Sequence, residues 1–168
     1  DPIRVTDQPG YHVLNNDRVT VLPTGRLLVP VATTADVNKV NKFESHVFYS
    51  DNLGRDWKRS TNSVPYEERG AMEPELLPIS TQQLRMHFRT QLGHIAVADS
   101  VDGGRTWGEA KSWSIRSPEA PATVRRIPST NHLLLVWNDA YTSGTDHGGK
   151  RTPLTADRKS TRLNSSHV

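Results

Sequence analysis

The clearest internal repeat in the chain is a pair of octapeptides, Ser50-Asp51-Asn52-Leu53-Gly54-Arg55-Asp56-Trp57 and Ser100-Val101-Asp102-Gly103-Gly104-Arg105-Thr106-Trp107. They begin fifty residues apart, and Ser, Gly, Arg and Trp stand at the same positions in both. Self-similarity at a fixed period of this length is typical of chains built from repeated structural units. The pair therefore predicts one supersecondary unit that recurs along the chain.

Short apolar segments accompany each octapeptide, and another set follows them. These segments are Arg18–Leu22, Arg26–Ala32, His46–Tyr49, Glu75–Ile79, Leu84–Thr90, His94–Val97, Ala122–Ile127 and His132–Asn138. Runs of this length, rich in Val, Leu, Ile and aromatic residues and separated by Gly, Pro, Asn and Ser, are typical of β-strands. No longer window has sustained helical periodicity. We predict an all-β chain of about three four-stranded antiparallel blades, with each octapeptide between the third and fourth strands of its blade.

The second octapeptide has a clear physical design for a tight turn. The Asp102 carboxylate can accept hydrogen bonds from turn amides, and Gly103 and Gly104 permit positive φ. Trp107 can then fold back over the turn and bury its large apolar ring. The first octapeptide is a weaker version, because Asn replaces this Asp and Asp replaces the Thr.

Composition excludes several classes of protein. The 168 residues correspond to about one domain. The absence of cysteine excludes disulfides, a Cys-ligated zinc site and a thiol nucleophile. No apolar run approaches the roughly 20 residues of a membrane-spanning helix. The net charge of +3 includes a basic C-terminus, and residues 1–156 carry only +1, so we expect no nucleic-acid partner.

The octapeptide Ser100–Trp107 matches the pattern Ser-x-Asp-x-Gly-x-Thr-Trp, the Asp-box or BNR repeat of sialidases, at every defined position. Further segments resemble bacterial sialidase (neuraminidase)-like proteins: Asn16–Val19, Gly25–Pro30, Glu73–Leu76, Phe88–Thr90, Ser117-Pro118 and Val136–Asp139. The resemblance extends from about Tyr11 to Ala156 and implies the middle three blades of a six-bladed β-propeller. It also implies a structural role for the Asp-box residues Ser50, Asn52, Gly54, Trp57, Ser100, Asp102, Gly104, Thr106 and Trp107.

The end of the chain resembles something other than a protein family. Residues Asp157–His167 are similar to a translated sequencing-library adapter, so residues 157–168 are interpreted as an artefactual tail and expected to be disordered. Residues 1–156 are then the partial propeller. Together with the start at Asp1, the tail indicates an internal fragment of a longer protein.

Glu73 and Arg89 lie sixteen residues apart, as a Glu and an Arg do in the proteins that this chain resembles. The resemblance implies that Glu73 assists a Tyr nucleophile and that Arg89 is one of three arginines binding the substrate carboxylate. A neutral phenol avoids repulsion by that carboxylate, and sialidases depart from two-carboxylate catalysis for this reason. The planar fork of Arg suits bidentate carboxylate binding. The alternative interpretation is a strand-end ion pair on a solvated rim.

Further polar residues are candidates for substrate binding. Arg18 precedes an apolar strand and could contact a carboxylate or hydroxyl, with Asp17 orienting it and Asn16 beside it, although such a run is also ordinary turn chemistry. Arg151 occupies a position similar to one in the family and is expected to be another anion contact. Glu119 is a weaker candidate, for which a capped loop is the favoured interpretation.

Metals and cofactors are not expected. The seven histidines lack a zinc-binding spacing such as His-Glu-x-x-His. The segment Gly144–Arg151 resembles a phosphate-binding loop, but Arg151 replaces the Ser or Thr that would hold Mg²⁺.

The resemblance implies a sialidase-like exo-glycosidase that hydrolyses a terminal acidic sugar of the sialic acid type from glycoconjugates. The acid/base Asp and the nucleophilic Tyr belong to other blades, so the fragment alone is expected to be inactive. We expect a glycan as partner, no membrane span, and a secreted or periplasmic parent protein. Two alternatives stay open, a non-catalytic carbohydrate-binding propeller and a hydrolase for another acidic sugar such as a uronate.

Overall fold

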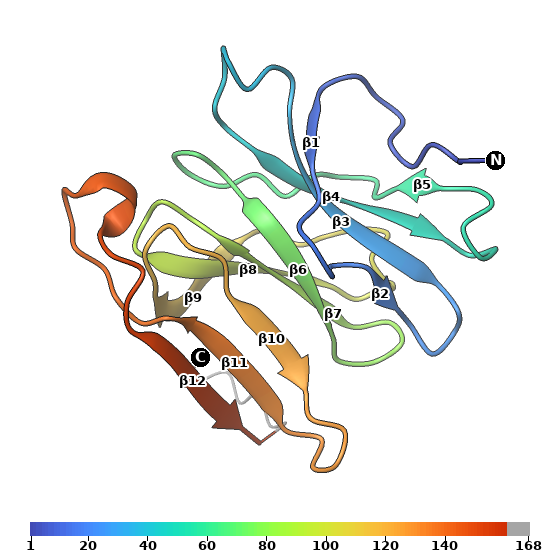
Figure 1. Ribbon diagram of the computed structural model, residues 1–168. Helices are drawn as coiled ribbons and strands as arrows, with labels where there is room; N and C mark the ends of the chain where they lie inside the picture. Colours follow the sequence, from blue (N-terminus) through green and yellow to red (C-terminus); the bar gives the residue numbers. More distant parts are fainter. Residues whose placement is uncertain (161–168) are drawn as a thin grey trace.

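The structure is a computed structural model that describes residues 1–160, and it is built from three antiparallel sheets (Figure 1). The first sheet contains β1 (Tyr11–Val13), β2 (Thr20–Val21), β3 (Leu27–Thr34), β4 (Glu44–Ser50) and β5 (Lys58–Arg59). The second contains β6 (Met72–Pro78), β7 (Leu84–Arg89), β8 (His94–Ser100) and β9 (Lys111–Arg116). The third contains β10 (Thr123–Arg126), β11 (Leu133–Asn138) and β12 (Leu154–Lys159).

The second sheet has the strand order of a propeller blade, β6-β7-β8-β9, and the first sheet has β3, β4 and β5 in the same succession. The octapeptides lie between β4 and β5 and between β8 and β9, which confirms the predicted position between third and fourth strands. The all-β partial propeller is therefore confirmed. The third sheet has three strands within residues 1–160, and the first has two short strands, β1 and β2, that both pair with β3.

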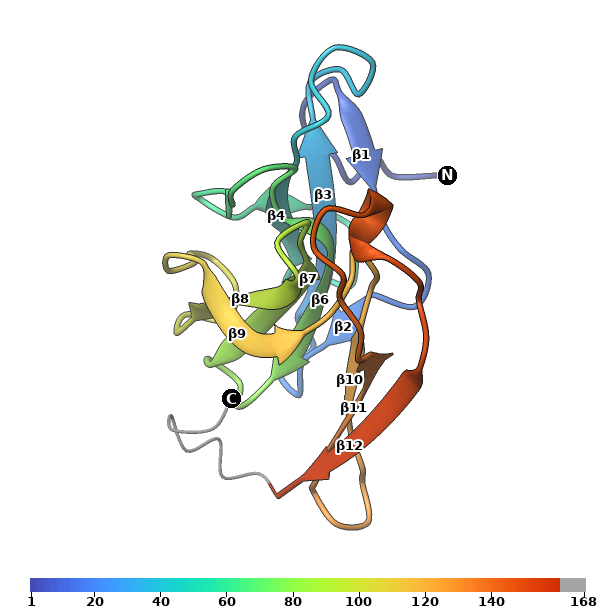
Figure 2. The ribbon, with the colours of Figure 1, turned by 90° about the vertical axis from the view of Figure 1, so that its left-hand side faces the viewer.

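The second sheet lies between the other two, because its strands are apolar on both faces. In β8, Ala96 and Ala98 join the core shared with the first sheet, whereas Ile95 and Val97 join the core shared with the third. Successive side chains of a strand point to opposite faces, so one strand can supply both cores. The strands β2, β6 and β10 lie beside one another in both views (Figures 1 and 2).

Several elements depart from the prediction. The edge strands β1, β5, β9 and β12 lie outside the predicted apolar segments, because an edge strand needs few apolar side chains. Asp157–Lys159, which belong to the tail predicted to be an artefact, lie in β12 and pair with Leu133–Leu135 of β11. Residues 161–168 of that predicted tail lie outside the described residues.

Helical structure within residues 1–160 is limited to one 3₁₀ turn, η1 (Asp146–Gly148). None of these residues forms a helix long and apolar enough to cross a membrane.

Candidate functional site

Glu73 and Arg89 meet at the open end of the β6–β7 hairpin. Arg89 pairs with Met72 in the strand register, and a register shift after Met72 forms a bulge. Glu73 sits in this bulge with a φ of 50°, a conformation that re-aims its side chain. Its Oε2 atom lies 3.2 Å from Nη1 of Arg89. The sixteen-residue spacing is thus the length of one hairpin that returns Arg89 to Glu73.

Arg89 is shared between two carboxylates. Its Nη2 atom lies 3.5 Å from Oε1 of Glu119. Burial lowers the pKa of the Arg89 guanidinium, and Glu73 and Glu119 oppose this shift, while Arg69 and Arg151 reinforce it. These electrostatic effects mean that three arginines and two glutamates occupy one neighbourhood.

Glu119 is the centre of that neighbourhood, although the sequence favoured only a loop role for it. Its side chain is fully buried, its Oε1 pairs with Nη1 of Arg69, and its Oε2 lies 2.8 Å from Nδ1 of His147. Nη2 of Arg151 donates to its backbone oxygen at 3.0 Å. We call Glu119 with Arg69, Arg89, His147 and Arg151 the Glu119 cluster. It brings together Arg89 and Arg151, both predicted anion contacts, beside Glu73.

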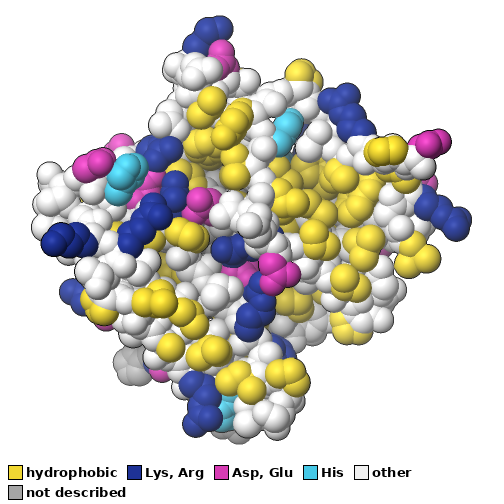
Figure 3. Space-filling view, in the orientation of Figure 1, with side chains coloured by type: hydrophobic (Ala, Val, Ile, Leu, Met, Phe, Trp, Pro, Cys, Tyr) yellow, Lys and Arg dark blue, Asp and Glu magenta, His cyan; other side chains and the backbone are white. Residues whose placement is uncertain are grey.

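The space-filling view agrees with this charged grouping. Figure 3 shows basic, acidic and His side chains together at the end of the molecule where η1 lies in Figure 1. A wide hydrophobic area covers the first sheet instead.

Arg18 lies in a different group. Its Nη1 pairs with Oε2 of Glu75, a β6 residue that is 1% exposed, and Arg125 pairs with the other oxygen of Glu75. His87 Nε2 lies 3.1 Å from the same Glu75 Oε2. We call these four residues the Glu75 cluster. Glu75 and His87 lie on the second sheet and Arg125 on the third, and Arg18 lies in the segment between β1 and β2, so the cluster joins the second and third sheets to that segment of the first.

The residues before Arg18 are oriented differently from the prediction. Asp17 is exposed, and its carboxylate lies 3.6 Å from Nη2 of Arg125, so its ion-pair partner is Arg125. Arg125 also donates to the Asp17 backbone oxygen at 3.1 Å. Asn16 is exposed in the same turn. Arg18 itself is buried and committed to Glu75, and we therefore leave it out of the carboxylate clamp proposed below.

His87 is the buried histidine of the Glu75 cluster. Burial, with a further contribution from Arg18, lowers its pKa to about 3, so the ring is neutral near pH 7. A neutral ring leaves the two arginines as the positive charges opposite Glu75.

The second octapeptide forms the turn that its residues predicted. Ser100 Oγ accepts from the Gly104 amide at 2.9 Å and donates to Asp102 Oδ1 at 2.9 Å. Asp102 Oδ1 also accepts from the Thr106 amide at 2.9 Å, and its other oxygen accepts from Thr106 Oγ1 at 2.6 Å. Trp107 packs against Gly104, where φ is 87°. These hydrogen bonds close within the turn.

The first octapeptide keeps this geometry with the chemistry reversed. Asn52 Oδ1 accepts from the Asp56 amide at 2.9 Å, and Asn52 Nδ2 donates to Asp56 Oδ2 at 2.7 Å. The donor and acceptor of the side-chain pair have exchanged places relative to Thr106 and Asp102. The two substitutions that weaken the sequence match therefore compensate each other.

The family of BNR repeat-like domains matches residues 2–165. The chain belongs to this family. As a BNR repeat-like chain it is sialidase-like, in agreement with the resemblance of its octapeptides.

Solved structures similar to this BNR repeat-like chain include sialidases. The Hadza microbial sialidase Hz136 is 21% identical with a TM-score of 0.65, and the match covers 81% of this chain and 27% of that one. The NanB sialidase of Streptococcus pneumoniae is 24% identical with a TM-score of 0.57, covering 73% and 18%. A protein of unknown function from Dyadobacter fermentans is 26% identical with a TM-score of 0.58, covering 73% and 34%. At these identities the sialidases show a shared fold, and the BNR repeat-like chain spans between 18% and 34% of the length of each neighbour.

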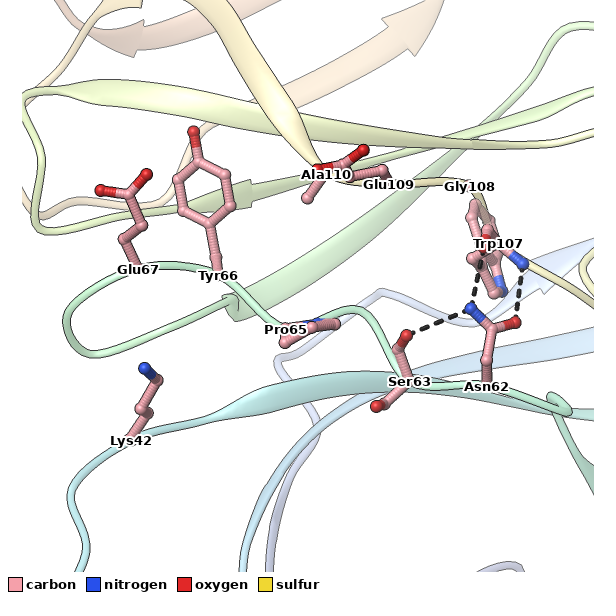
Figure 4. Close-up of a pocket in the computed structure, with 10 residues that line it drawn as sticks. All are labelled: Lys42, Asn62, Ser63, Pro65, Tyr66, Glu67, Trp107, Gly108, Glu109 and Ala110. Carbon is pink, nitrogen blue, oxygen red and sulfur yellow. Dashed lines mark hydrogen bonds between the residues drawn. The ribbon is translucent and has the colours of Figure 1, made fainter.

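A separate pocket of about 440 Å³ lies between the β5–β6 connection and the end of the second octapeptide (Figure 4). Asn62 holds its wall together, because its Oδ1 accepts from the Trp107 amide at 3.0 Å and its Nδ2 donates to the Trp107 oxygen at 2.8 Å. Neither Glu73 nor Arg89 lines this pocket. The hydrogen bonds between Asn62 and Trp107 in its wall attach the first sheet to the second.

Sequence reasoning missed the roles of Arg69, Glu119 and His147. Each lies in a loop, between β5 and β6, between β9 and β10, and between β11 and β12 respectively. The one sequence signal was that Glu119 and Arg69 are charged residues next to buried positions. Ordinary loops have the same pattern, so this signal does not predict a role.

Within the described residues, no group of three or more His, Asp or Glu side chains is placed to hold a metal ion.

Proposed function

We propose that this chain carries part of the substrate site of a sialidase-type exo-glycosidase that removes a terminal acidic sugar from glycoconjugates. One observation carries the proposal: Arg89 and Arg151, from the second sheet and from the loop before β12, converge on Glu119 beside Glu73. Two guanidinium groups on one side of a sugar site suit a carboxylate, because each can bind it through paired N–H donors.

Glu73 has the properties that the assisting carboxylate needs. It is partly exposed, and its Oε2 lies 3.2 Å from Nη1 of Arg89, so a phenol assisted by Glu73 would stand next to the arginine clamp. The carboxylate of a sialic acid repels a carboxylate nucleophile, which favours a neutral phenol assisted by Glu. We expect the phenol and the acid/base Asp to come from other blades, so this chain binds the sugar without turning it over.

The test measures binding of N-acetylneuraminate to the chain by NMR titration or calorimetry. Arg89→Ala is expected to weaken binding at least tenfold, because a charge-assisted bidentate contact contributes about 1.5–3 kcal/mol. Arg55→Ala, which removes an exposed arginine from the first octapeptide, is the matched control and should leave affinity unchanged. Equal affinity of Arg89→Ala and the parent chain would exclude the clamp.

A second measurement separates an enzyme from a binding propeller. Extending the chain to its complete reading frame and assaying release of sialic acid should give turnover that Glu73→Gln reduces. Binding that depends on Arg89 without any turnover by the complete protein would favour the carbohydrate-binding alternative.

A further inference from the structure

His147 is attached to Glu119 at two points. Its backbone oxygen accepts from the Glu119 amide at 2.9 Å, and its Nδ1 lies 2.8 Å from Glu119 Oε2. Glu119 therefore holds both the backbone and the side chain of His147. This double attachment fixes the position of the ring relative to the carboxylate that Arg89 and Arg69 also contact.

The local backbone at His147 is unusual for a residue with a side chain. Its φ of 52° lies in the left-handed region, between two residues of a 3₁₀ turn. Gly148 follows at a φ of 71°, with the Tyr141 ring so close that a Cβ at this position would lie 2.8 Å from it. The loop could place glycine at both positions if it needed only a reversal of direction. A histidine held there at positive φ indicates that its side chain is used.

The ion pairs of Glu119 determine which nitrogen of the ring is free. The carboxylate accepts from Arg69, lies near Arg89, and therefore acts as the acceptor for His147 as well. Nδ1 of His147 then carries the hydrogen, and Nε2 of the neutral ring is a hydrogen-bond acceptor. The side chain of His147 is 52% exposed, so this acceptor is at the surface.

The neighbours of the free nitrogen are compatible with a ligand. Nε2 lies 3.6 Å from Oδ1 of Asp146, whose side chain is exposed and can turn away. Arg151, which belongs to the same cluster, is exposed as well. An oriented acceptor therefore stands beside a group of guanidinium donors. A sugar acid offers the matching pattern, with a carboxylate to accept from arginine and hydroxyl groups to donate.

We propose that His147 is a specificity-determining contact of this site, in which Nε2 accepts a hydrogen bond from a hydroxyl of the acidic sugar whose carboxylate lies on Arg89 and Arg151. Glu119 is the positioning residue that fixes the ring. The inference rests on the proposed function, since it needs the arginine clamp. It adds a basis for distinguishing a sugar acid from a simple carboxylate, which the arginines alone do not provide.

The experiment compares two ligands, N-acetylneuraminate and pyruvate, a carboxylate without hydroxyl groups. His147→Ala should weaken N-acetylneuraminate binding about 3- to 10-fold, the effect of one hydrogen bond, and leave pyruvate binding unchanged. His132→Ala, in the β10–β11 turn, is the matched control and should change neither affinity. Thermal unfolding of each variant checks that it is folded.

A second readout tests the positioning role of Glu119. The nitrogen chemical shifts of His147 should report hydrogen on Nδ1 in the parent chain, and Glu119→Gln should alter that tautomer ratio and reduce the preference for the sugar acid.

Each outcome bears on a different statement. If Arg89→Ala abolishes binding of both ligands and His147→Ala weakens only the sugar acid, the clamp and the inference both hold. If His147→Ala leaves sugar-acid affinity unchanged, or weakens both ligands equally as loss of a loop anchor would, the inference is wrong and the clamp stands. If Arg89→Ala affects neither ligand, the proposed function fails and the inference fails with it.

Discussion

Glu75 and Glu119 are both 1% exposed, and both are surrounded by arginines and a histidine. They differ in their place in the fold and in how exposed their histidine partners are. Glu75 lies on a strand and joins the three sheets through Arg18 and Arg125. Glu119 lies in a loop and gathers Arg69, His147 and Arg151 from other loops and Arg89 from the end of β7. The histidines mark the difference, because His87 is 1% exposed and His147 is 52% exposed.

Structural charge and ligand-binding charge are distinguished in this fold by how exposed the partners of each glutamate are. In the Glu75 cluster the basic partner Arg18 is buried, so its charge is needed to compensate Glu75. In the Glu119 cluster the basic groups Arg151 and His147 reach the surface while still touching Glu119. Arg125 of the Glu75 cluster is 48% exposed, so both clusters have positive charge at the surface, but only the Glu119 cluster has a histidine ring there as well.

Glu75→Ala is expected to destabilise the chain more than any other single substitution considered for the two clusters. This change leaves the buried guanidinium of Arg18 without its carboxylate, and removing one partner of a buried ion pair costs about 3–5 kcal/mol. Urea unfolding followed by tryptophan fluorescence should show a loss of this size. Glu109→Ala, at an exposed position, is the control and should change the unfolding free energy by less than about 0.5 kcal/mol. A small effect of Glu75→Ala would mean that the sheets do not depend on this cluster.

Glu119→Ala is expected to cost less stability, about 1–3 kcal/mol, because Arg151 and His147 can be solvated when the carboxylate is lost. The same variant should lose most of its N-acetylneuraminate binding, since Glu119 orients the groups of the clamp. Unfolding and binding measured on one preparation test both statements. A stability loss as large as that of Glu75→Ala would remove the distinction between the two clusters.

Acid should destabilise the chain through His87. Its pKa is about 3 in the folded state against 6.5 as the ordinary value, so the folded state disfavours protonation. This contribution to stability is complete above pH 6.5 and is lost as the pH falls from 6.5 toward 3, by about 1.4 kcal/mol per pH unit. His87→Gln should make the unfolding free energy less dependent on pH between 6.5 and 5. An unchanged slope would show that His87 is accessible to protons in the folded state.

The smallest expected effect comes from a carboxylate outside both clusters. Asp102→Ala removes the acceptor of the Thr106 amide and hydroxyl at the surface of the second octapeptide, with an expected cost of about 1–2 kcal/mol. Asn52→Ala, in the first octapeptide, should cost less, because only the hydrogen bond from Asn52 to the Asp56 carboxylate is charge-assisted, whereas the Asp102 carboxylate is the charged partner in all its hydrogen bonds. Equal unfolding free energies for the two variants would show that the charge of Asp102 adds nothing.

Local patterns predicted a large part of the fold. The octapeptides determine their own turns, because their hydrogen bonds join residues two to four positions apart. The same locality explains Glu73 and Arg89, since one hairpin brings them together. The edge strands β1, β5, β9 and β12 were missed because backbone pairing with a neighbour, rather than apolar side chains, defines them.

The Glu119 cluster could not be predicted in this way. Arg69 and His147 lie 50 and 28 residues from Glu119 in sequence, and each loop alone is an ordinary polar segment. The structural role of Arg18 depends in the same way on Glu75, which lies 57 residues away in sequence. No local pattern could reveal which of the chain's basic residues each glutamate would pair with.

The amino-acid order alone specified the repeat, its strands and the turns between them, because period, alternation and turn chemistry act over a few neighbouring residues. The packing of the three sheets decided which charges are buried together and which remain open. Burial and partner choice depend on residues from separate blades, and the free energy of a charge depends on both. Whether an arginine of this chain supports the fold or faces a ligand is therefore a property of the assembled sheets.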